Sequence, residues 1–280
     1  MPEIEEIKEP IEEVKIEETD LDKWKPKTNL GKKIKEKKIT DIDQVFQAGE
    51  RILEAEIVDF LLPDLETDLL LIGQAKGKFG GGKRRIFRQT QKKTKEGNKI
   101  HFTTCALIGN KNGFVGIGFG KSKETVPARD KALRKAKLNL IKISRGCGSW
   151  ECNCGNPHSI PYAVEGKCGS VRVKLIPAPK GKGLCIEKES AKILKIAGIK
   201  DVWSKTQGQT NTRINLIKAV IQALSRLSKV KINPNEIQKL GVIEGKTIPI
   251  EGEIIKELKS EPKPIRKKEF QKKRKREGNN

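Results

Sequence analysis

The sequence predicts an α+β protein with two folded domains between charged tails. Residues 101–108 and 114–119 alternate apolar and polar side chains as strands do, and the turn sequence GNKNG at 109–113 joins them. A helical apolar pattern follows, and strands then alternate with helices over residues 171–227. Both ends of the chain are charged and poor in apolar residues, so neither end can form a core alone.

The composition divides the 280 residues into six segments. We expect, in order, a charged mobile tail at 1–40, a short helical extension at 41–75, a folded domain at 76–145, a cysteine-rich segment at 146–158, a second folded domain at 159–230 and a charged extension at 231–280. The basic end, Pro262–Asn280, should be disordered alone and order along RNA. The acidic opening, Glu3–Asp20, should stay mobile or pair with a basic protein.

The first domain is expected to combine the two strands with a basic helix. In the second strand Gly116, Gly118 and Gly120 leave one face nearly bare, a surface that another backbone can approach. The helix is predicted from about Val126 to Ile143, with an apolar stripe formed by Ala132, Leu133, Ala136, Leu140 and Ile143. A unit of two strands and a helix with a basic face can bind duplex RNA through its shape and its phosphates.

The second domain is expected to alternate strands and helices. Its predicted elements are a strand at Val171–Ile176, a stiff basic turn at Pro177–Gly183, a helix at Glu189–Ala197 ended by Gly198, a strand at Asp201–Thr206, and a helix capped by Asn211 or Thr212 that continues to about Leu227. The core face of that last helix is predicted to be Leu216, Val220, Ala223 and Leu227.

The chain is strongly basic, with 59 lysines and arginines against 36 acids, a formal charge of +23 and a pI near 9.7. A field of this sign implies a polyanionic partner. Nucleic acid is favoured over a lipid surface, because aromatic residues make up only 4% of the chain. Acids interrupt the most apolar stretch, 57–72, and the N-terminus has no apolar signal core. We therefore expect a soluble cytosolic protein.

The most basic loop, Lys76–Arg88, reads KGKFGGGKRRIFR and contains no acid. Glycine lets backbone N–H groups approach a partner, while Lys and Arg add charge and donors, a combination that suits a phosphate backbone. A solvated basic linker is the alternative, although linkers rarely carry Phe79, Ile86 and Phe87. With the basic helix and the turn of the second domain, the predicted RNA-binding residues are Lys76, Lys78, Lys83, Arg84, Arg85, Arg88, Lys121, Lys123, Arg129, Lys131, Arg134, Lys135, Lys180 and Lys182.

The segment GIGFGKS at 116–122 has some similarity to nucleotide-binding motifs but departs from them. A phosphate-binding loop requires a glycine where this chain has Val115, and a dinucleotide fingerprint requires G-x-G-x-x-G. The segment is also predicted to lie in a hairpin and not at a strand-to-helix turn. We therefore expect no nucleotide hydrolysis and no catalytic residues.

Four side chains of the kinds that bind metals lie close together in the spacing C-x4-C-x-C-x3-H. They are Cys147, Cys152, Cys154 and His158. Three thiolates and an imidazole form a common tetrahedral zinc set, so a structural zinc is expected. Reduced thiols are the first alternative and a catalytic or redox site is the second. Cys168 is a possible substitute for one ligand, whereas Cys105 and Cys185 lie in strand-like runs and are predicted core residues.

Three stretches in this order carry a family resemblance: GNKNGFVGIGFGKSKETVPARDKALRKAKLNLIKI from Gly109, PHSIPYAVEGKCGSVRVKLIPAPKGKGL from Pro157 and LKIAGIKDVWSKTQGQTNTRINLIKAVIQAL from Leu194. They resemble the ribosomal protein S-five family of the small subunit over about residues 76–228. The stretches WKPKTNLG and ITDIDQVF, from Trp24 and Ile39, are similar to the archaeal and eukaryotic branch, whose eukaryotic counterpart is ribosomal protein S-two.

The resemblance implies a double-stranded-RNA-binding-like first domain and a second domain with a left-handed β-α-β crossover, a departure from the usual handedness. It also implies a structural constituent of the small ribosomal subunit that binds rRNA, supports accuracy and lies near the channel by which mRNA enters. The implied neighbours are the ribosomal proteins S-three, S-four and S-eight. A free duplex-RNA-binding regulator with a zinc knuckle is the second interpretation, and an RNA-modifying enzyme is the third.

Overall fold

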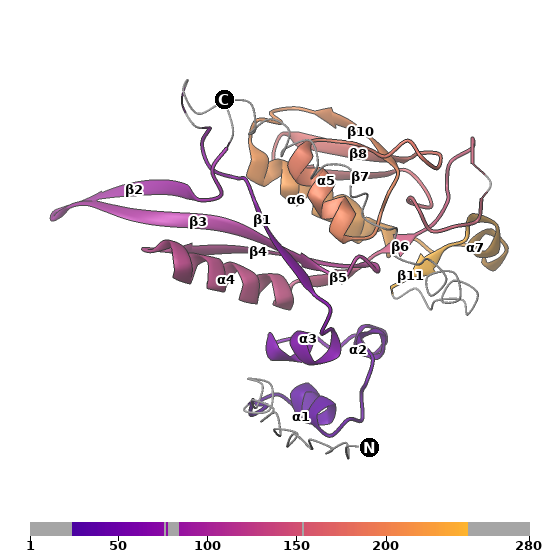
Figure 1. Cartoon of the computed structure of the whole chain (residues 1–280), viewed down its shortest axis with the longest axis horizontal. Helices are drawn as coiled ribbons and strands as arrows, with labels where there is room; N and C mark the ends of the chain where they lie inside the picture. The colour runs from indigo at the N-terminus through magenta and orange to yellow at the C-terminus, as the bar shows by residue number, and fades with distance from the viewer. Residues whose placement is uncertain (1–23, 76, 78–83, 153, 246–280) are drawn as a thin grey trace, which may run out of the picture. The chain divides into compact units, whose positions relative to one another are not determined.

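The computed structural model describes residues 24–75, 77, 84–152 and 154–245. Within these residues the strands form three sheets, of five, four and two strands (Figure 1). The expectation of a mixed α and β protein with several sheets is confirmed. The acidic opening and the basic end from Pro262, for which sequence analysis predicted mobility and RNA-dependent order, lie outside the described residues.

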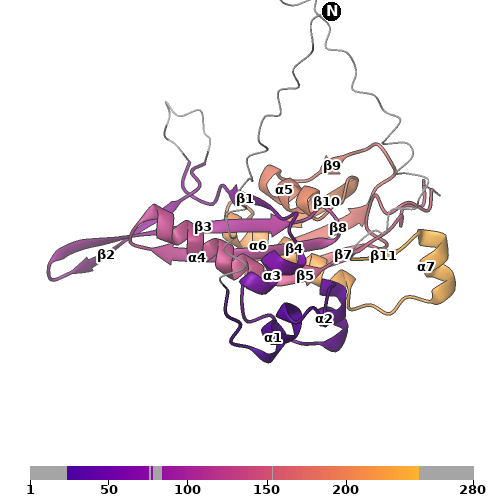
Figure 2. The ribbon, with the colours of Figure 1, turned by 60° about the horizontal axis from the view of Figure 1, so that its bottom comes forward.

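Three short helices open the described chain, α1 (Asn29–Lys35), α2 (Ile42–Ala48) and α3 (Glu56–Leu61) (Figure 2). Their apolar side chains, among them Leu30 and Ile34, pack into a small core of their own. The charged tail predicted for residues 1–40 therefore differs from the structure in its last part, because these two apolar residues fold α1 onto its neighbours. Thr28 is the N-cap residue of α1, and its hydroxyl accepts a hydrogen bond from the Gly31 N–H at 3.1 Å.

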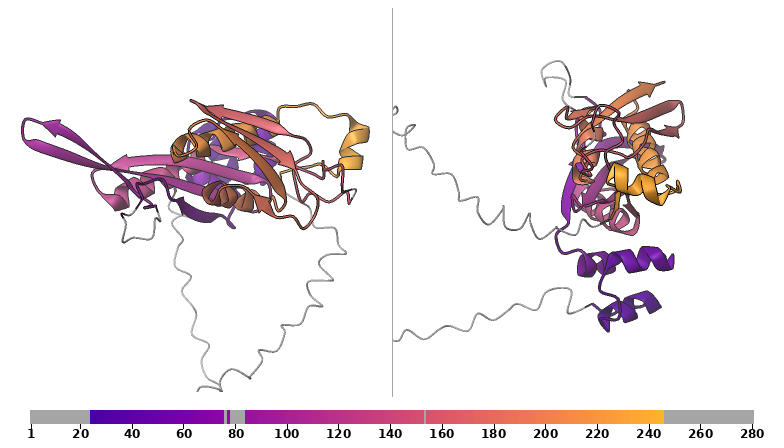
Figure 3. Two further views of the ribbon diagram at one scale, coloured as in Figure 1. Left: turned by 90° about the horizontal axis from the view of Figure 1, so that it is seen from above. Right: turned by 90° about the vertical axis from the view of Figure 1, so that its right-hand side faces the viewer.

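The first sheet is antiparallel and built around β3 (Gly97–Gly109), which pairs with β1 (Glu66–Leu70), β2 (Arg88–Thr94) and β4 (Phe114–Ser122); β5 (Leu140–Lys142) pairs with β4. The two strands predicted from alternation are present in β3 and β4. In the turn between them, the Asn110 side chain accepts hydrogen bonds from the backbone N–H groups of Asn112 and Phe114. The prediction missed the other three strands of this sheet. β1 lies in the supposed helical extension, β2 in the supposed basic loop and its continuation, and β5 in the end of the predicted helix. β2 and the start of β3 extend as a hairpin away from the other elements (Figure 3).

From Thr104 to Gly109, β3 is buried on both faces, and its alternating side chains enter two separate cores. Ala106 and Ile108 pack with α4 (Thr125–Leu138) and with the N-terminal helices. Cys105 and Leu107 point the other way, into a core made largely by the second sheet and its helices. The two predicted domains therefore share one continuous apolar core, which lies on the face of the first sheet opposite to α4.

α4 lies against the glycine face of β4. A Cβ placed on Gly118 would lie 2.1 Å from the carbonyl oxygen of Ala132, and one on Gly120 would lie 1.9 Å from that of Ala128. The bare strand face thus receives the backbone of the chain's own helix, so it is not a surface open to RNA. α4 ends at Leu138, earlier than predicted, because the chain turns at Asn139 and adds β5 to the sheet. Leu140 and Ile143 are buried, but not as part of a helical stripe.

The second sheet has the order β7 (Val164–Cys168), β8 (Val171–Pro177), β10 (Val202–Gln207), β9 (Leu184–Cys185). β9 and β10 are parallel and joined through α5 (Lys188–Ile196), whereas the other pairs are antiparallel. α5 is followed by Gly198 at a φ of +85°, as the glycine signal predicts. α6 (Arg213–Leu227) buries the four predicted core residues against this sheet.

Part of the predicted C-terminal extension is folded. α7 (Pro234–Leu240) is followed by β11 (Ile243–Glu244), which pairs with β6 (Ser144–Arg145) in the smallest sheet. The side chain of Arg145 is buried, and its guanidinium donates to the carbonyl oxygens of Gly245 at 3.0 Å and Lys111 at 3.4 Å. Residues far apart in the chain thereby meet immediately before the cysteine-rich segment.

Candidate metal centre and nucleic-acid interface

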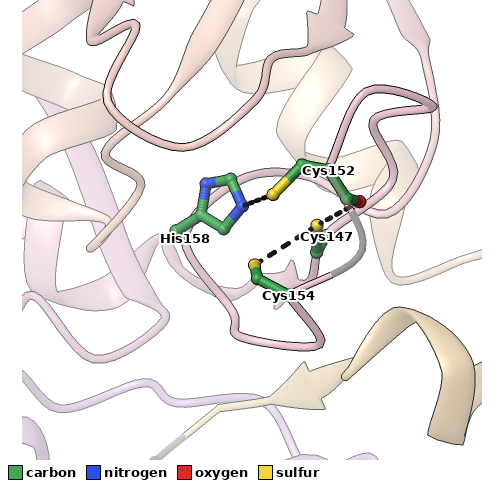
Figure 4. A group of neighbouring side chains, drawn as sticks. All are labelled: Cys147, Cys152, Cys154 and His158. Carbon is green, nitrogen blue, oxygen red and sulfur yellow. Dashed lines mark hydrogen bonds between the residues drawn. The ribbon is translucent and has the colours of Figure 1, made fainter.

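The four predicted metal ligands converge in the structure. The ligand atoms of Cys147, Cys152, Cys154 and His158 all lie within 4.8 Å of one another (Figure 4). The sulfurs of Cys147 and Cys154 are 3.5 Å apart, and the Cys152 sulfur lies 3.7 Å from Nε2 of His158. Neighbouring sulfurs around a tetrahedral ion with bonds of about 2.3 Å are separated by about 3.8 Å. The spacing fits such an ion, so these residues can hold a metal.

Local backbone contacts bring the ligands together. Gly146 and Ser159 form an isolated bridge that closes the segment at its base, with reciprocal hydrogen bonds of 3.0 Å. The Cys147 N–H donates to the carbonyl oxygen of Leu240 at 2.7 Å, which attaches the segment to α7. Gly155 has a φ of +63°, a left-handed conformation that lets the chain reverse between the third thiol and the histidine.

A buried carboxylate orients the histidine. Nδ1 of His158 lies 2.9 Å from Oδ2 of Asp201, and both side chains are only 6% exposed. A carboxylate accepts, so Nδ1 carries the proton and donates, which leaves the lone pair of Nε2 facing the sulfurs. This is the tautomer that metal ligation requires. Asp201 lies 43 residues away, and sequence analysis did not single it out.

The thiols have different acidities. Burial raises the pKa of Cys147 to about 11. The pKa of Cys152 is lowered to about 6 by a hydrogen bond from the Lys180 backbone and by its contact with the Cys154 thiol. The surroundings of Cys152 therefore favour its thiolate form, which is the form that binds a metal. Cys168, the possible substitute ligand, lies on β7 and is outside the group that forms within the described residues.

Cys185 does not have the core position predicted for it. Cys105 is fully buried on β3, where burial raises its pKa to about 12. Cys185 is exposed, because β9 is a short edge strand of the second sheet. Its apolar surroundings in the sequence were a misleading signal.

The predicted RNA-binding residues lie on three parts of the fold. Three of them lie just before and at the start of β2: Arg84 is half-buried, whereas Arg85 and Arg88 are exposed. The remaining described members are all exposed, with Lys121 on β4, Lys123 just after it, Arg129, Lys131, Arg134 and Lys135 on α4, and Lys180 and Lys182 in the loop between β8 and β9. The predicted contacts Lys76, Lys78 and Lys83 lie outside the described residues.

Two of these cations already face acids. Arg129 lies 3.6 Å from Asp130, and Arg134 lies 3.8 Å from Glu56 of α3. Both pairs are exposed and long, so each contributes little and competes weakly with a phosphate. Lys137, on the same helix, is bound more tightly to Asp59 at 2.7 Å and belongs to the packing of α3 on α4.

The hairpin of β2 and β3 adds basic residues that sequence analysis missed. The exposed members are Lys92, Lys93, Lys95 and Lys99. The only sequence signal is the turn KEGN, in which Gly97 adopts a φ of +104°. Polar residues occupy both faces of β2, so no alternation marks the strand.

None of the helices in the described part of the chain is long and apolar enough to cross a bilayer.

Comparisons with known families identify the class. Two family models match, described as the N-terminal domain of ribosomal protein S5 at residues 86–144 and its C-terminal domain at residues 166–240. The first match covers β2, β3, β4, α4 and β5, and the second covers the second sheet from Gly166 onward together with α5, α6 and α7. The chain is thus a ribosomal protein with both S5 domains in order, and the family is one of structural proteins, not enzymes.

Relatives from archaea extend the match to most of the chain. A small ribosomal subunit protein uS5 of Nanoarchaeum equitans is 50% identical over 81% of this chain and 98% of its own length. The uS5 proteins of Methanococcus maripaludis and Methanocaldococcus jannaschii are 45% and 44% identical, over 80% and 81% of this chain and 93% and 98% of their own lengths. The chain belongs to the uS5 family of the small ribosomal subunit.

Proposed function

We propose that this chain binds small-subunit rRNA through the arginines before β2, the exposed face of α4 and the loop between β8 and β9. The observation that carries the proposal is the exposure of the basic residues on all three parts. Counterion release from phosphates favours such a surface without base recognition. The succession of β2, β3, β4 and α4 supports a double-stranded-RNA-binding-like first domain, in which the glycine face holds the helix and leaves its outer face to RNA.

A salt titration tests the rRNA interface. Replacement of Lys83, Arg84, Arg85 and Arg88 by Ala should lower the slope of log affinity against log salt by about 0.7–0.9 for each lost phosphate contact. A matched control removes four lysines that are paired with acids, namely Lys33, Lys38, Lys111 and Lys192. An unchanged slope, or an equal decrease in the control, would contradict the interface.

We also propose that the metal held by the cysteine-rich segment is a structural zinc. The donor set of three sulfurs and one imidazole, the tautomer of His158 and the sulfur spacing all support zinc in a closed site. Such an ion supplies folding energy and leaves no open position for a substrate.

Metal analysis of the purified chain should find about one equivalent of zinc. Cys152→Ser should lose it and destabilise the contacts with α7 and Asp201, whereas Cys168→Ser is the control that should retain it. Metal that persists in Cys152→Ser would favour reduced thiols, and loss in Cys168→Ser would show that the ligand set is wrong.

In the small subunit of cytoplasmic ribosomes, we place the chain near the channel by which mRNA enters, beside the proteins S-three, S-four and S-eight. There it would support accuracy. These finer statements, and the left-handed crossover through α5, rest on the family resemblance. A structural constituent remains stoichiometric in salt-washed small subunits, whereas a free RNA-binding regulator is removed by the wash. Crosslinks from the hairpin of β2 and β3 to mRNA and to those proteins would test the location.

A further inference from the structure

The basic loop between β8 and β9, Pro177–Gly183, is held by one buried carboxylate. The backbone N–H groups of Gly181 and Gly183 both donate to Oδ1 of Asp201, at 3.1 and 2.8 Å. Both glycines have positive φ, +89° and +73°, and a Cβ on either would meet nothing within 4 Å. The loop therefore lacks packing at these positions. The two hydrogen bonds to Asp201 help to hold its conformation, together with the Val202 N–H, which donates to the Gly183 carbonyl oxygen at 3.2 Å.

The same carboxylate contacts the metal centre. While Oδ1 of Asp201 accepts from the loop, Oδ2 accepts from Nδ1 of His158 at 2.9 Å. The backbone of Asp201 is fixed as well, because its N–H donates to the His158 carbonyl oxygen at 3.1 Å. The contact is therefore set by backbone and side chain together, at a residue that is 4% exposed.

The loop is thus joined through Asp201 to one of the four ligands, His158, by two N–H donors of its backbone, those of Gly181 and Gly183. The side chains of Lys180 and Lys182 are exposed on the same loop.

An ion bound by Nε2 of His158 would fix the ring and the proton on Nδ1, which strengthens the hydrogen bond to Asp201. Without an ion the ring can rotate or change its tautomer, and the buried carboxylate then loses its charge-assisted partner. Loss of one partner of a buried charged pair is costly, so the carboxylate shifts or takes up water. Either change releases the two glycine N–H groups.

We propose that Asp201 is a positioning residue that couples occupancy of the metal centre to the conformation of the basic loop, so that the bound metal sets how Lys180 and Lys182 are presented to a phosphate backbone. The inference rests on the proposed zinc and rRNA binding. The alternative is that Asp201 only closes the loop, in which case removal of the metal would not affect Gly181 and Gly183.

Hydrogen exchange on the full-length chain separates these alternatives. Removal of zinc with a chelator should speed exchange at Gly181 and Gly183 by about tenfold or more, because both lose their acceptor. The β2–β3 hairpin, which extends away from the other elements (Figure 3), should exchange equally with and without zinc. Unchanged exchange at both glycines after verified loss of the metal would overturn the proposal.

Asp201→Asn tests the residue itself. It keeps the size of the side chain but presents an N–H₂ group or a weaker acceptor to the ring and the loop. Zinc affinity in a chelator competition should fall by about 10–100-fold, and the two glycines should exchange rapidly even with zinc bound. Asp64→Asn removes the same charge from an exposed position between α3 and β1. It should change neither the zinc affinity nor the exchange rates of the two glycines. Wild-type affinity and exchange in Asp201→Asn would refute the coupling. If the variant fails to fold, hydrogen exchange of the wild-type chain with and without zinc decides whether the metal and the loop are coupled.

Lys180→Ala/Lys182→Ala distinguishes this inference from the proposed function. The double variant should bind rRNA more weakly, and removal of zinc should then cause no further loss of rRNA affinity through this loop. Normal rRNA binding by the double variant, with exchange still dependent on zinc, would remove the loop from the RNA interface and keep the coupling. Weakened binding with exchange independent of zinc would keep the interface and refute the coupling.

Discussion

Gly118 tests the packing of α4 on the first sheet. The residue lies on β4 opposite Ala106 of β3, with the helix directly above it. In Gly118→Ala the new Cβ would lie 2.1 Å from the carbonyl oxygen of Ala132, 2.3 Å from the backbone nitrogen of Ala136 and 2.8 Å from the carbonyl carbon of Lys135. All three atoms belong to the helix backbone, so no rotamer change relieves the clash.

The size of the effect follows from these distances. Ordinary contact begins at 3.4 Å, so the helix must move outward by about 1 Å to accommodate one methyl group. That movement separates Ala132 and Ala136 from Ile108 and Phe114 in the core they share. Overpacking of a well-packed core costs about 1–3 kcal/mol, and contact with rigid backbone puts this site at the upper end. For a chain of this size we expect Tm to fall by about 6–12 °C.

Thermal unfolding of the purified chain, followed by circular dichroism, measures the change. Gly77→Ala is the matched control, because its Cβ would meet nothing within 4 Å and its φ is not in the left-handed region. The control should stay within about 0.5 kcal/mol of the wild type. A Tm for Gly118→Ala that equals that of Gly77→Ala would show that the approach of helix to strand is looser than described.

Two further predictions concern titratable groups. A thiol reagent should modify the exposed Cys185 in the native chain and reach the buried Cys105 only on unfolding, which peptide mass spectrometry detects, and equal rates would contradict the burial on β3. Burial alone would raise the pKa of Glu54, but hydrogen bonds from Thr28, Lys27 and Trp24 outweigh it and the pKa lies below its ordinary value. Its stabilising contribution is therefore present above about pH 4.5 and lost as the pH falls through the lower folded value. The indole N–H resonance of Trp24 should report that loss, and Glu54→Gln should abolish its pH dependence.

Sequence reasoning located the elements whose side chains alternate and missed those that do not. β4 alternates because Val115 and Ile117 enter one core while the glycines between them face α4, and the buried half of β3 is apolar on both faces. β2 reads RQTQKKT and is polar on both faces, since the hairpin extends from the sheet, so its pairing with β3 leaves no trace in hydrophobicity. The end of α4 was placed too late because Leu140 and Ile143 fit a helical period equally well when a strand buries them.

The metal ligands were predictable because they are close in sequence, within the twelve residues that begin at Cys147. Chemistry and spacing alone identify such a set. Asp201 was not predictable, because its role arises only where β10 begins beside the segment, and a lone aspartate before a strand has no distinctive pattern. The same holds for the Leu240 carbonyl, which receives the Cys147 N–H. Partners contributed by tertiary structure leave no local signal.

The cysteine-rich segment cannot stabilise itself by burial, which gives a physical reason for the ion proposed above. Its largest apolar side chain, Trp150, is 88% exposed, and of its other described residues Cys147 is the one buried hydrophobic. Its contacts are instead hydrogen bonds to distant elements, through Leu240 at the end of α7 and Asp201 before β10. Each bond contributes only about 1 kcal/mol net, too little to order a glycine-rich segment whose backbone loses about that much per residue. Bonds to the proposed ion would close the deficit, so loss of the ion should disorder both junctions together.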